Sequence, residues 1–272
     1  MPSWRIILSA LTLVVALLPG CASTGPDNPS FPLSSAEARM EINAMTLEKK
    51  PLPRPLVLIG GYGDLGISQY LLLKNFFESV AEHPKLITVS LFNCGSYEEC
   101  RARILETVNA ACPGADANWT AEVDVVGVSL GGGVARYAAA PSRDSAHPQR
   151  LRIVRLFTMS GALAGAKVAN FGITSFQQEM QPGSDTQKYL AAADANPPYE
   201  VVSYVHLGDE MVGQENAALP GRTPYWLPNL PYNPIWPHEQ IMLDSRVYAD
   251  IARRLRGERP YTVSPPAPFP KG

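Results

Sequence analysis

Short apolar runs alternate with longer amphipathic segments through the middle of the chain. Apolar runs without alternation are typical of strands that are covered on both faces. They predict strands at Pro55–Ile59, Leu86–Leu91, Val123–Val128, Ile153–Met159 and Tyr199–His206. Helical spacing predicts helices at Ser34–Lys50 (with Ser35 as N-cap), Ser68–Ala81, Tyr97–Ala111, Gly132–Ala140 and Leu243–Leu255. This alternation predicts the α/β class, with a mostly parallel, doubly wound sheet and helices on both faces.

The chain begins with a pattern of its own. Arg5 precedes an uninterrupted apolar run, Ile6–Leu18, which is too short for a typical membrane-spanning helix but suits a secretory signal. The run ends in Leu18-Pro19-Gly20-Cys21, which resembles the lipobox of bacterial lipoproteins. The resemblance implies that Cys21 is lipidated and begins the mature protein, and Ala22 after it favours an outer-membrane anchor facing the periplasm. A simple cleaved signal with an incidental cysteine is the alternative.

These patterns divide the chain into four parts. Residues 1–20 are a lipoprotein signal peptide, 21–54 a tether and N-terminal segment, 55–258 the α/β domain and 259–272 a proline-rich tail. Ala22–Ser30 has the composition of a flexible tether, and the tail is expected to be extended.

Composition excludes several classes of protein. The 272 residues are 46% hydrophobic and 18% charged, which is too apolar for a disordered chain. A formal net charge of -2 without a basic run offers no binding surface for nucleic acid. No group of His, Cys or acidic residues has the spacing of a metal site, so neither metal nor organic cofactor is expected.

Three cysteines follow the signal. If Arg101–Ala111 is helical, Cys100 and Cys112 stand about 18 Å apart, whereas a disulfide tolerates only about 7 Å between Cα atoms. Cys94 and Cys100 are therefore the plausible disulfide pair in an oxidising compartment, and Cys112 is expected to be a buried free thiol. The alternative, with all three reduced, stays open.

The turn after the third predicted strand carries candidate chemistry. Gly127-Val128-Ser129-Leu130-Gly131 fits the G-x-S-x-G pattern and lies between a strand and a helix. Glycines at 127 and 131 leave room for a sharp turn that lifts the serine hydroxyl above the sheet. A serine needs a base, and of the four histidines only His238 lies in a loop after the last predicted strand, where it can reach the carboxyl ends of the strands. His206 is the weaker alternative.

Asp124–Ala140, preceded by the strand PLVLIGGYGD, resembles the α/β-hydrolase superfamily and most of all its bacterial lipase and esterase branch. The resemblance implies a Ser–acid–His triad, with Ser129 as nucleophile, Asp209 as acid and His238 as base, and with Glu210 as the fallback acid. It also implies an oxyanion hole from the backbone N–H groups of Tyr62 and Leu130. In the family a histidine precedes this glycine-aromatic run, and here Gly60 replaces it.

The substrate is less defined by the sequence. Val212–Pro237 lacks helical or strand periodicity, and its aromatic residues either pack on the core or line an acyl-binding pocket. A second segment, Gly161–Gln181, is a candidate for a small cap over the site. The prediction is a lipid-anchored serine hydrolase that cleaves small-molecule or lipid carboxylic esters. A thioesterase or acyltransferase with the same triad, and a non-catalytic envelope scaffold, are the alternatives.

Overall fold

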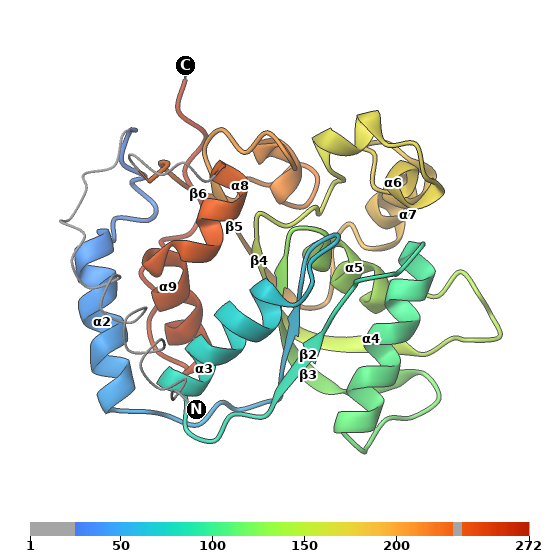
Figure 1. Cartoon of the computed structure of the whole chain (residues 1–272), viewed down its shortest axis with the longest axis horizontal. Coiled ribbons are helices and arrows are strands. Elements are labelled where there is room, and N and C mark those ends of the chain that lie inside the picture. The colour runs from blue at the N-terminus through green and yellow to red at the C-terminus, as the bar shows by residue number, and fades with distance from the viewer. Residues whose placement is uncertain (1–24, 231–235, 272) are drawn as a thin grey trace, which may run out of the picture.

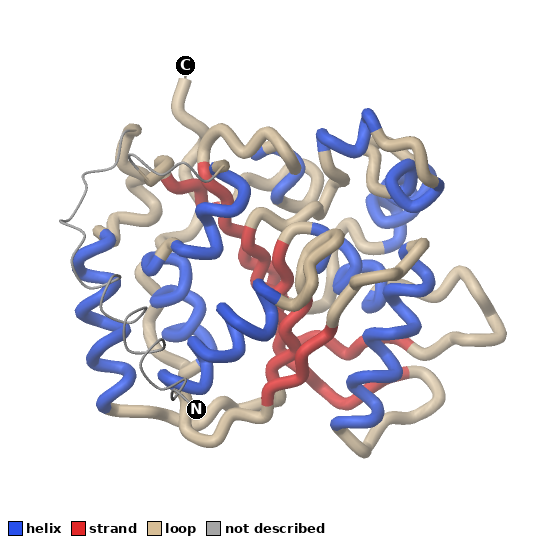
Figure 2. The backbone as a smooth tube through the Cα atoms, in the orientation of Figure 1, coloured by secondary structure: helices blue, strands red, loops and turns tan. Residues whose placement is uncertain are grey.

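A six-stranded sheet forms the centre of the molecule (Figures 1 and 2). The computed structural model describes residues 25–230 and 236–271. The strands are β1 (Leu56–Ile59), β2 (Leu86–Val89), β3 (Trp119–Val128), β4 (Arg150–Met159), β5 (Glu200–His206) and β6 (Tyr225–Leu227). They lie in the order β2-β1-β3-β4-β5-β6, and every neighbouring pair is parallel. The α/β prediction is confirmed.

Helices cover both faces of this sheet (Figure 1). The longer ones are α2 (Ser35–Leu47), α3 (Asn75–Val80), α4 (Tyr97–Ala111), α5 (Leu130–Ala139), α7 (Asp185–Ala193) and α9 (Ser245–Leu255). Because side chains alternate along a strand, Val57 and Ile59 pack on the face covered by α4 and α5, while Leu56 and Leu58 pack on the face covered by α2, α3 and α9. Both faces of β1 are therefore buried, as its uniformly apolar sequence requires.

The order in which successive strands are added to the sheet changes direction at β1. From β1 the chain moves outward to β2, and then returns to β3 on the other side of β1. In open α/β sheets, ligands bind outside the carboxyl ends of the strands at such a reversal. The loop after β1, residues 60–66, and the turn after β3 at Ser129 lie on either side of this point.

Several predicted elements have different limits. The N-cap of α2 is Ser34, not Ser35, because the Ser34 hydroxyl accepts the N–H of Glu37 while the Glu37 carboxylate accepts the N–H of Ser34. The helix predicted at Ser68–Ala81 is a π-helix, η2 (Ile67–Lys74), followed by α3. Strand β6 and a 3₁₀ turn, η4 (Gln214–Ala217), lie within the stretch predicted to lack regular structure.

Both ends of the described chain pack against the edge strand β6. Asn28 is buried and its side-chain amide donates to the carbonyl of Trp226 at 2.6 Å. In the tail, the N–H of Ala267 donates to the Ser30 hydroxyl, and the Trp226 indole donates to the Ala267 carbonyl. The flexible-tether prediction is thus wrong for residues 28–30.

The predicted signal peptide and Cys21 lie outside the described residues. Within residues 25–230 and 236–271 no helix has the length and apolar character to cross a membrane.

The cysteine prediction needs a correction. Cys94, Cys100 and Cys112 are all buried free thiols in the structure, so Cys94 and Cys100 are not joined. Burial, together with a hydrogen bond to Cys94, raises the pKa of the Cys100 thiol. Disulfide formation requires the thiolate. The raised pKa lowers the fraction of Cys100 that is present as the reactive thiolate.

Candidate active site

The turn between β3 and α5 has the backbone of a nucleophile elbow. Ser129 has φ 52° and ψ -124°, a conformation that side-chain-bearing residues rarely adopt and that is found at functional sites. The glycines on either side make the turn possible. A Cβ atom at Gly127 would lie 2.6 Å from the backbone nitrogen of Gly132, and one at Gly131 would lie 2.6 Å from the carbonyl oxygen of Ile59. Both distances are too short for any side chain.

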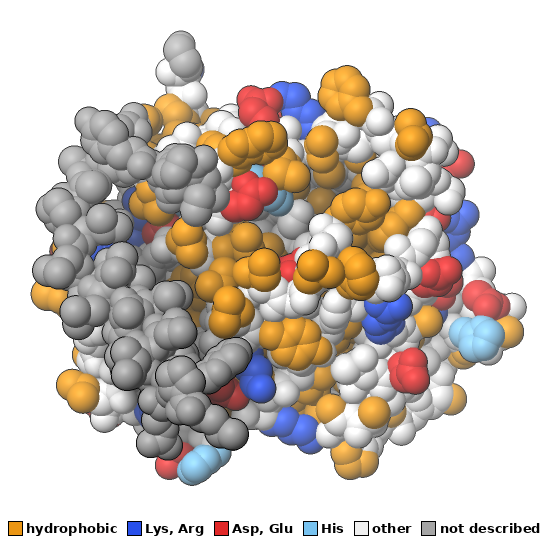
Figure 3. All heavy atoms as spheres, in the orientation of Figure 1, with side chains coloured by type: hydrophobic (Ala, Val, Ile, Leu, Met, Phe, Trp, Pro, Cys, Tyr) orange, Lys and Arg blue, Asp and Glu red, His pale blue; other side chains and the backbone are white. Residues whose placement is uncertain are grey.

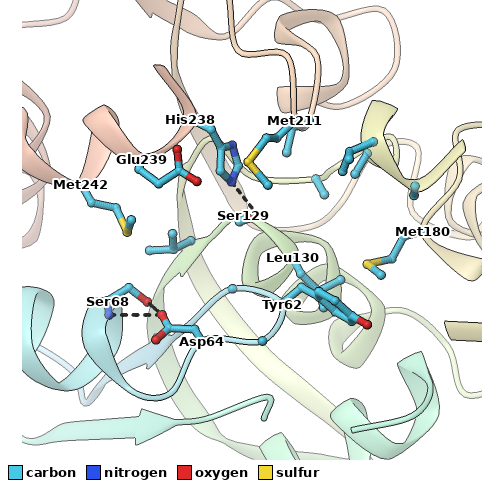
Figure 4. Close-up of a pocket in the computed structure, with 18 of the residues that line it drawn as sticks. Tyr62, Asp64, Ser68, Ser129, Leu130, Met180, Met211, His238, Glu239 and Met242 are labelled. Carbon is cyan, nitrogen blue, oxygen red and sulfur yellow. Dashed lines mark hydrogen bonds between the residues drawn. The ribbon is translucent and has the colours of Figure 1, made fainter. Parts of the chain in front are cut away.

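One imidazole connects the serine to a carboxylate. His238 lies on α8 (Pro237–Gln240), where Pro237 occupies the first helical position and fixes the backbone leading into the turn. His238 Nε2 is 3.0 Å from Ser129 Oγ (Figure 4). Nδ1 of the same ring is 3.0 Å from Asp209 Oδ2. The three residues come from loops after β3, β5 and β6, which all end at the same edge of the parallel sheet.

Asp209 is held in its charged form. Its Oδ1 atom accepts the N–H groups of Met211 and Val212, each at 3.0 Å, which leaves Oδ2 for the imidazole. Burial by itself raises the pKa of Asp209, but the hydrogen bond and charge of His238 and the Val212 N–H outweigh burial, so the pKa lies below its usual value. An ionised Asp209 holds a proton on His238 Nδ1 and leaves Nε2 free to accept the serine proton.

The alternative residues occupy other positions. His206 is completely buried and its Nε2 pairs with Asp244 at 2.8 Å, away from Ser129. Glu210, the fallback acid, is exposed and pairs with Lys167. His147 is exposed and pairs with Asp144 before β4, at the amino end of that strand. His83 lies in the connection before β2. None of these groups contacts Ser129.

The residues predicted for the oxyanion hole lie beside the serine. Leu130 begins α5, and the first N–H groups of a helix have no acceptor within the helix. The loop after β1 passes close by, because a Cβ atom at Gly61 would lie only 3.3 Å from the Cβ of Ser129. Tyr62 follows in that loop and lines the same pocket as Ser129 and Leu130. The backbone of this loop therefore passes next to Ser129.

The position that the family fills with histidine is occupied from elsewhere in the chain. A Cβ atom at Gly60 would lie 2.1 Å from Gln69 Oε1, so the buried Gln69 side chain takes up this space. The loop is further fixed by Asp64. Its Oδ1 atom accepts the N–H groups of Gly66 and Ile67, and its Oδ2 atom accepts the hydroxyl of Ser68.

A pocket of about 840 Å³ opens above Ser129. One side is formed by the cap segment, defined as Gly161–Gln181, which includes η3 (Lys167–Phe171) and α6 (Ser175–Glu179). The other side is formed by η2, α8 and η5 (Ile241–Leu243). Side chains at the mouth are apolar and exposed, among them Leu65 (75%) and Phe171 (87%), and Figure 3 shows apolar side chains gathered on this face of the molecule.

The cap segment, rather than the proline-rich loop, supplies the apolar wall. Tyr225, Trp226 and Leu227 are buried in β6 and pack on the core, and no described residue of 225–236 lines the pocket. The sequence did not single out Met180 or Glu239, which do line it. In the sequence, Met180 is marked only by its place within the candidate cap, and Glu239 only by its place next to His238.

Comparison with known proteins bears on the fold. No protein-family model and no curated protein sequence matches the chain. Among solved structures it is similar to the mature form of the lipase BlEst2 from Bacillus licheniformis, with a TM-score of 0.52 and 14% identity over 78% of this chain and 94% of that one. The fold is that of the α/β-hydrolases. The propeptide form of BlEst2 gives a TM-score of 0.54 at 14% identity over 82% of this chain and 53% of that one.

The α/β-hydrolase fold explains the position of the site at the carboxyl ends of the strands. It does not identify the chemistry, since the fold serves many reactions. Within the described residues there is no group of three or more His, Cys, Asp or Glu side chains arranged to hold a metal ion. The side-chain groups that contact one another at the site are the Ser129 hydroxyl, the His238 imidazole and the Asp209 carboxylate.

Proposed function

We propose that this protein is a serine hydrolase that cleaves carboxylic esters through an acyl-enzyme. The observation that carries the proposal is the single hydrogen-bonded chain Ser129–His238–Asp209, with both links at 3.0 Å. An aliphatic hydroxyl is a poor nucleophile at neutral pH, and a neutral imidazole in hydrogen-bond contact is the group that activates it.

The reaction follows from this geometry. Ser129 Oγ attacks the ester carbonyl carbon while its proton passes to His238 Nε2, and the carbonyl oxygen becomes an oxyanion facing the N–H groups of Tyr62 and Leu130. Collapse of the tetrahedral species breaks the bond to the alcohol oxygen, which takes the proton from Nε2. Water then attacks the acyl-enzyme, again losing its proton to His238, and the acid is released. Asp209 stabilises the imidazolium in both halves of the reaction.

The cap side of the pocket is proposed to bind the acyl chain. Ala162, Ala166, Ala169 and Met180 are buried and apolar, and they line the pocket from one side. Each methylene that leaves water contributes about 0.8 kcal/mol, or up to about fourfold in kcat/KM.

We therefore expect hydrolysis of p-nitrophenyl esters to rise steeply from acetate toward medium-length chains. Ala169→Phe fills the cap side and is expected to move the optimum to shorter chains. Ala192→Phe, on an exposed position of α7, is the matched control and should leave the profile unchanged. An optimum at acetate in the wild type, or the same optimum in Ala169→Phe, would contradict this position for the acyl chain.

We also propose that Cys21 carries a lipid anchor in the bacterial cell envelope, on the periplasmic side of the outer membrane. Support comes from the position of Gly25, four residues after Cys21. A Cβ atom at Gly25 would lie 3.0 Å from Pro228, just after the carboxyl end of β6 and thus at the edge of the sheet that holds Ser129. Four residues of chain reach at most about 14 Å. A lipid on Cys21 would place the apolar mouth of the pocket near the membrane.

The anchor is tested by Cys21→Ser. Wild-type protein is expected in the membrane fraction, to partition into the detergent phase and to incorporate labelled palmitate, and Cys21→Ser is expected to lose all three properties. Cys94→Ser is the control for loss of an unrelated thiol. Equal membrane association of wild type and Cys21→Ser would refute the anchor and leave the hydrolase proposal standing.

A further inference from the structure

One acidic side chain in the pocket has no partner for its buried oxygen. Glu239 follows His238 on α8 and lines the pocket, and its Oε2 atom is shielded from solvent without any hydrogen-bond donor. A buried carboxylate oxygen without a donor is costly. The other carboxylate in the described lining, Asp64, has both oxygens occupied by N–H donors from its own loop and from the start of η2.

The described part of the pocket wall provides no cationic side chain of its own to pair with Glu239. Among the described lining residues there is no lysine and no arginine. The catalytic imidazole is already bound on both sides, by Ser129 and by Asp209. Glu239 Oε2 is therefore an acceptor that a ligand can satisfy and that the described residues around it do not.

The two sides of the pocket differ in polarity. Figure 4 shows Glu239, Ser68 and Asp64 on one side of Ser129, together with Met242, and Met180 on the other. An acyl chain laid against Glu239 would leave the carboxylate oxygen dry and unpaired. On the cap side the described lining carries one polar side chain, the uncharged Gln177, and is otherwise apolar or glycine. His238 must also hand its proton to the leaving alcohol, so the alcohol part lies next to the imidazole, whose neighbour on α8 is Glu239.

We propose that Glu239 is a specificity-determining residue that selects esters whose alcohol part carries a hydrogen-bond donor, either a hydroxyl or an ammonium group. The inference rests on the proposed ester hydrolysis and concerns only the choice of alcohol. Hydrogen bonds to a charged acceptor are strong enough to favour a donor-bearing alcohol by about tenfold or more in kcat/KM. An anionic alcohol part, such as a phosphate ester, is disfavoured by the same carboxylate.

The test uses two pairs of butyrate esters that differ only in the donor. Glycerol 1-monobutyrate is compared with propyl butyrate, and protonated 2-(dimethylamino)ethyl butyrate with its neutral isostere 3-methylbutyl butyrate. The quantity measured is the ratio of kcat/KM within each pair, for wild type, Glu239→Gln and Glu239→Leu. Glu210→Gln, an exposed glutamate outside the pocket, is the matched control.

Glu239→Leu is expected to lower both ratios by about tenfold relative to wild type. Glu239→Gln keeps an acceptor oxygen but loses the charge, so it is expected to lower the ammonium ratio and to retain much of the hydroxyl ratio. A loss confined to one pair in Glu239→Leu identifies which donor the site binds. Ratios that agree within about twofold between wild type and both variants would overturn the proposal.

Failure of the proposed function looks different. If wild-type protein hydrolysed neither neutral ester, or did so equally well without the Ser129 hydroxyl, then the ester-hydrolase proposal would fall and this inference with it. If the neutral esters are cleaved in a Ser129-dependent way and only the ratios fail to change, then the inference about Glu239 alone is wrong.

Discussion

Replacing Ser129 or His238 by alanine is expected to lower kcat for ester hydrolysis by at least about 10⁴-fold, with little change in stability. Ser129→Ala removes the atom that forms the acyl-enzyme, and His238→Ala removes the imidazole that is hydrogen-bonded to it. Because the two groups act as one unit, the double variant is expected to be no worse than either single variant. The measurement is steady-state hydrolysis of p-nitrophenyl butyrate.

His147→Ala is the matched control for this prediction. His147 also contacts a carboxylate, Asp144, at 2.7 Å, but the pair is exposed and lies before the amino end of β4, whereas Ser129 follows the carboxyl end of the parallel neighbour β3. Its removal is expected to change kcat by less than about twofold. Residual hydrolysis in His238→Ala near the wild-type rate would mean that another group deprotonates Ser129, and the assignment of the base would be wrong.

Asp209→Asn is expected to lower kcat by about 10⁴-fold while leaving the shape of the site intact. The amide can still accept the N–H groups of Met211 and Val212, so the loop after β5 keeps its structure. Facing His238, however, an amide NH₂ group donates to Nδ1 and moves the imidazole proton to Nε2. In that tautomer Nε2 cannot accept the proton of Ser129. The measurement is again kcat, together with the melting temperature.

Glu210→Gln separates the two candidate acids. Its side chain points to solvent and pairs with Lys167, so this change is expected to alter kcat by less than about twofold. If Glu210→Gln lost more activity than Asp209→Asn, then the fallback acid would be the true one.

Asp209 also contributes to stability, because its pKa is lower in the folded protein than in the unfolded chain. This contribution is fully present at pH values above the ordinary pKa of an aspartate, near 4, and is lost as the pH falls below that value.

The site could be predicted from the sequence to the extent that its residues carry local signals. Gly127, Ser129 and Gly131 occur within five residues at the junction of a strand and a helix. The two glycines are required because backbone of α5 and of the end of β1 lies too close for a side chain. His238 is the one histidine placed after the last predicted strand. Asp209 could be assigned only by resemblance, since a carboxylate in a loop looks the same in sequence whether it pairs with solvent or with an imidazole.

Features made by contacts between distant segments were not predictable. Strand β6 has only three residues and is defined by its pairing with Tyr204–His206. Asn28 looks like part of a tether until its amide is seen to bind the Trp226 carbonyl. The Gln69 side chain fills the space above Gly60, and no local pattern indicates this. That Glu239 Oε2 lacks a hydrogen-bond donor likewise depends on which side chains surround it in space, and the sequence does not show this.

Covalent labelling with a fluorophosphonate followed by mass spectrometry tests the role of Ser129 most directly. The reagent bonds only to a serine activated by its neighbours. Wild-type protein is expected to gain one adduct, located on the peptide that contains Ser129, and neither Ser129→Ala nor His238→Ala is expected to gain any. Folded wild-type protein that takes no label, or that carries the label on another serine, would contradict the hydrolytic triad and favour a non-catalytic envelope protein instead.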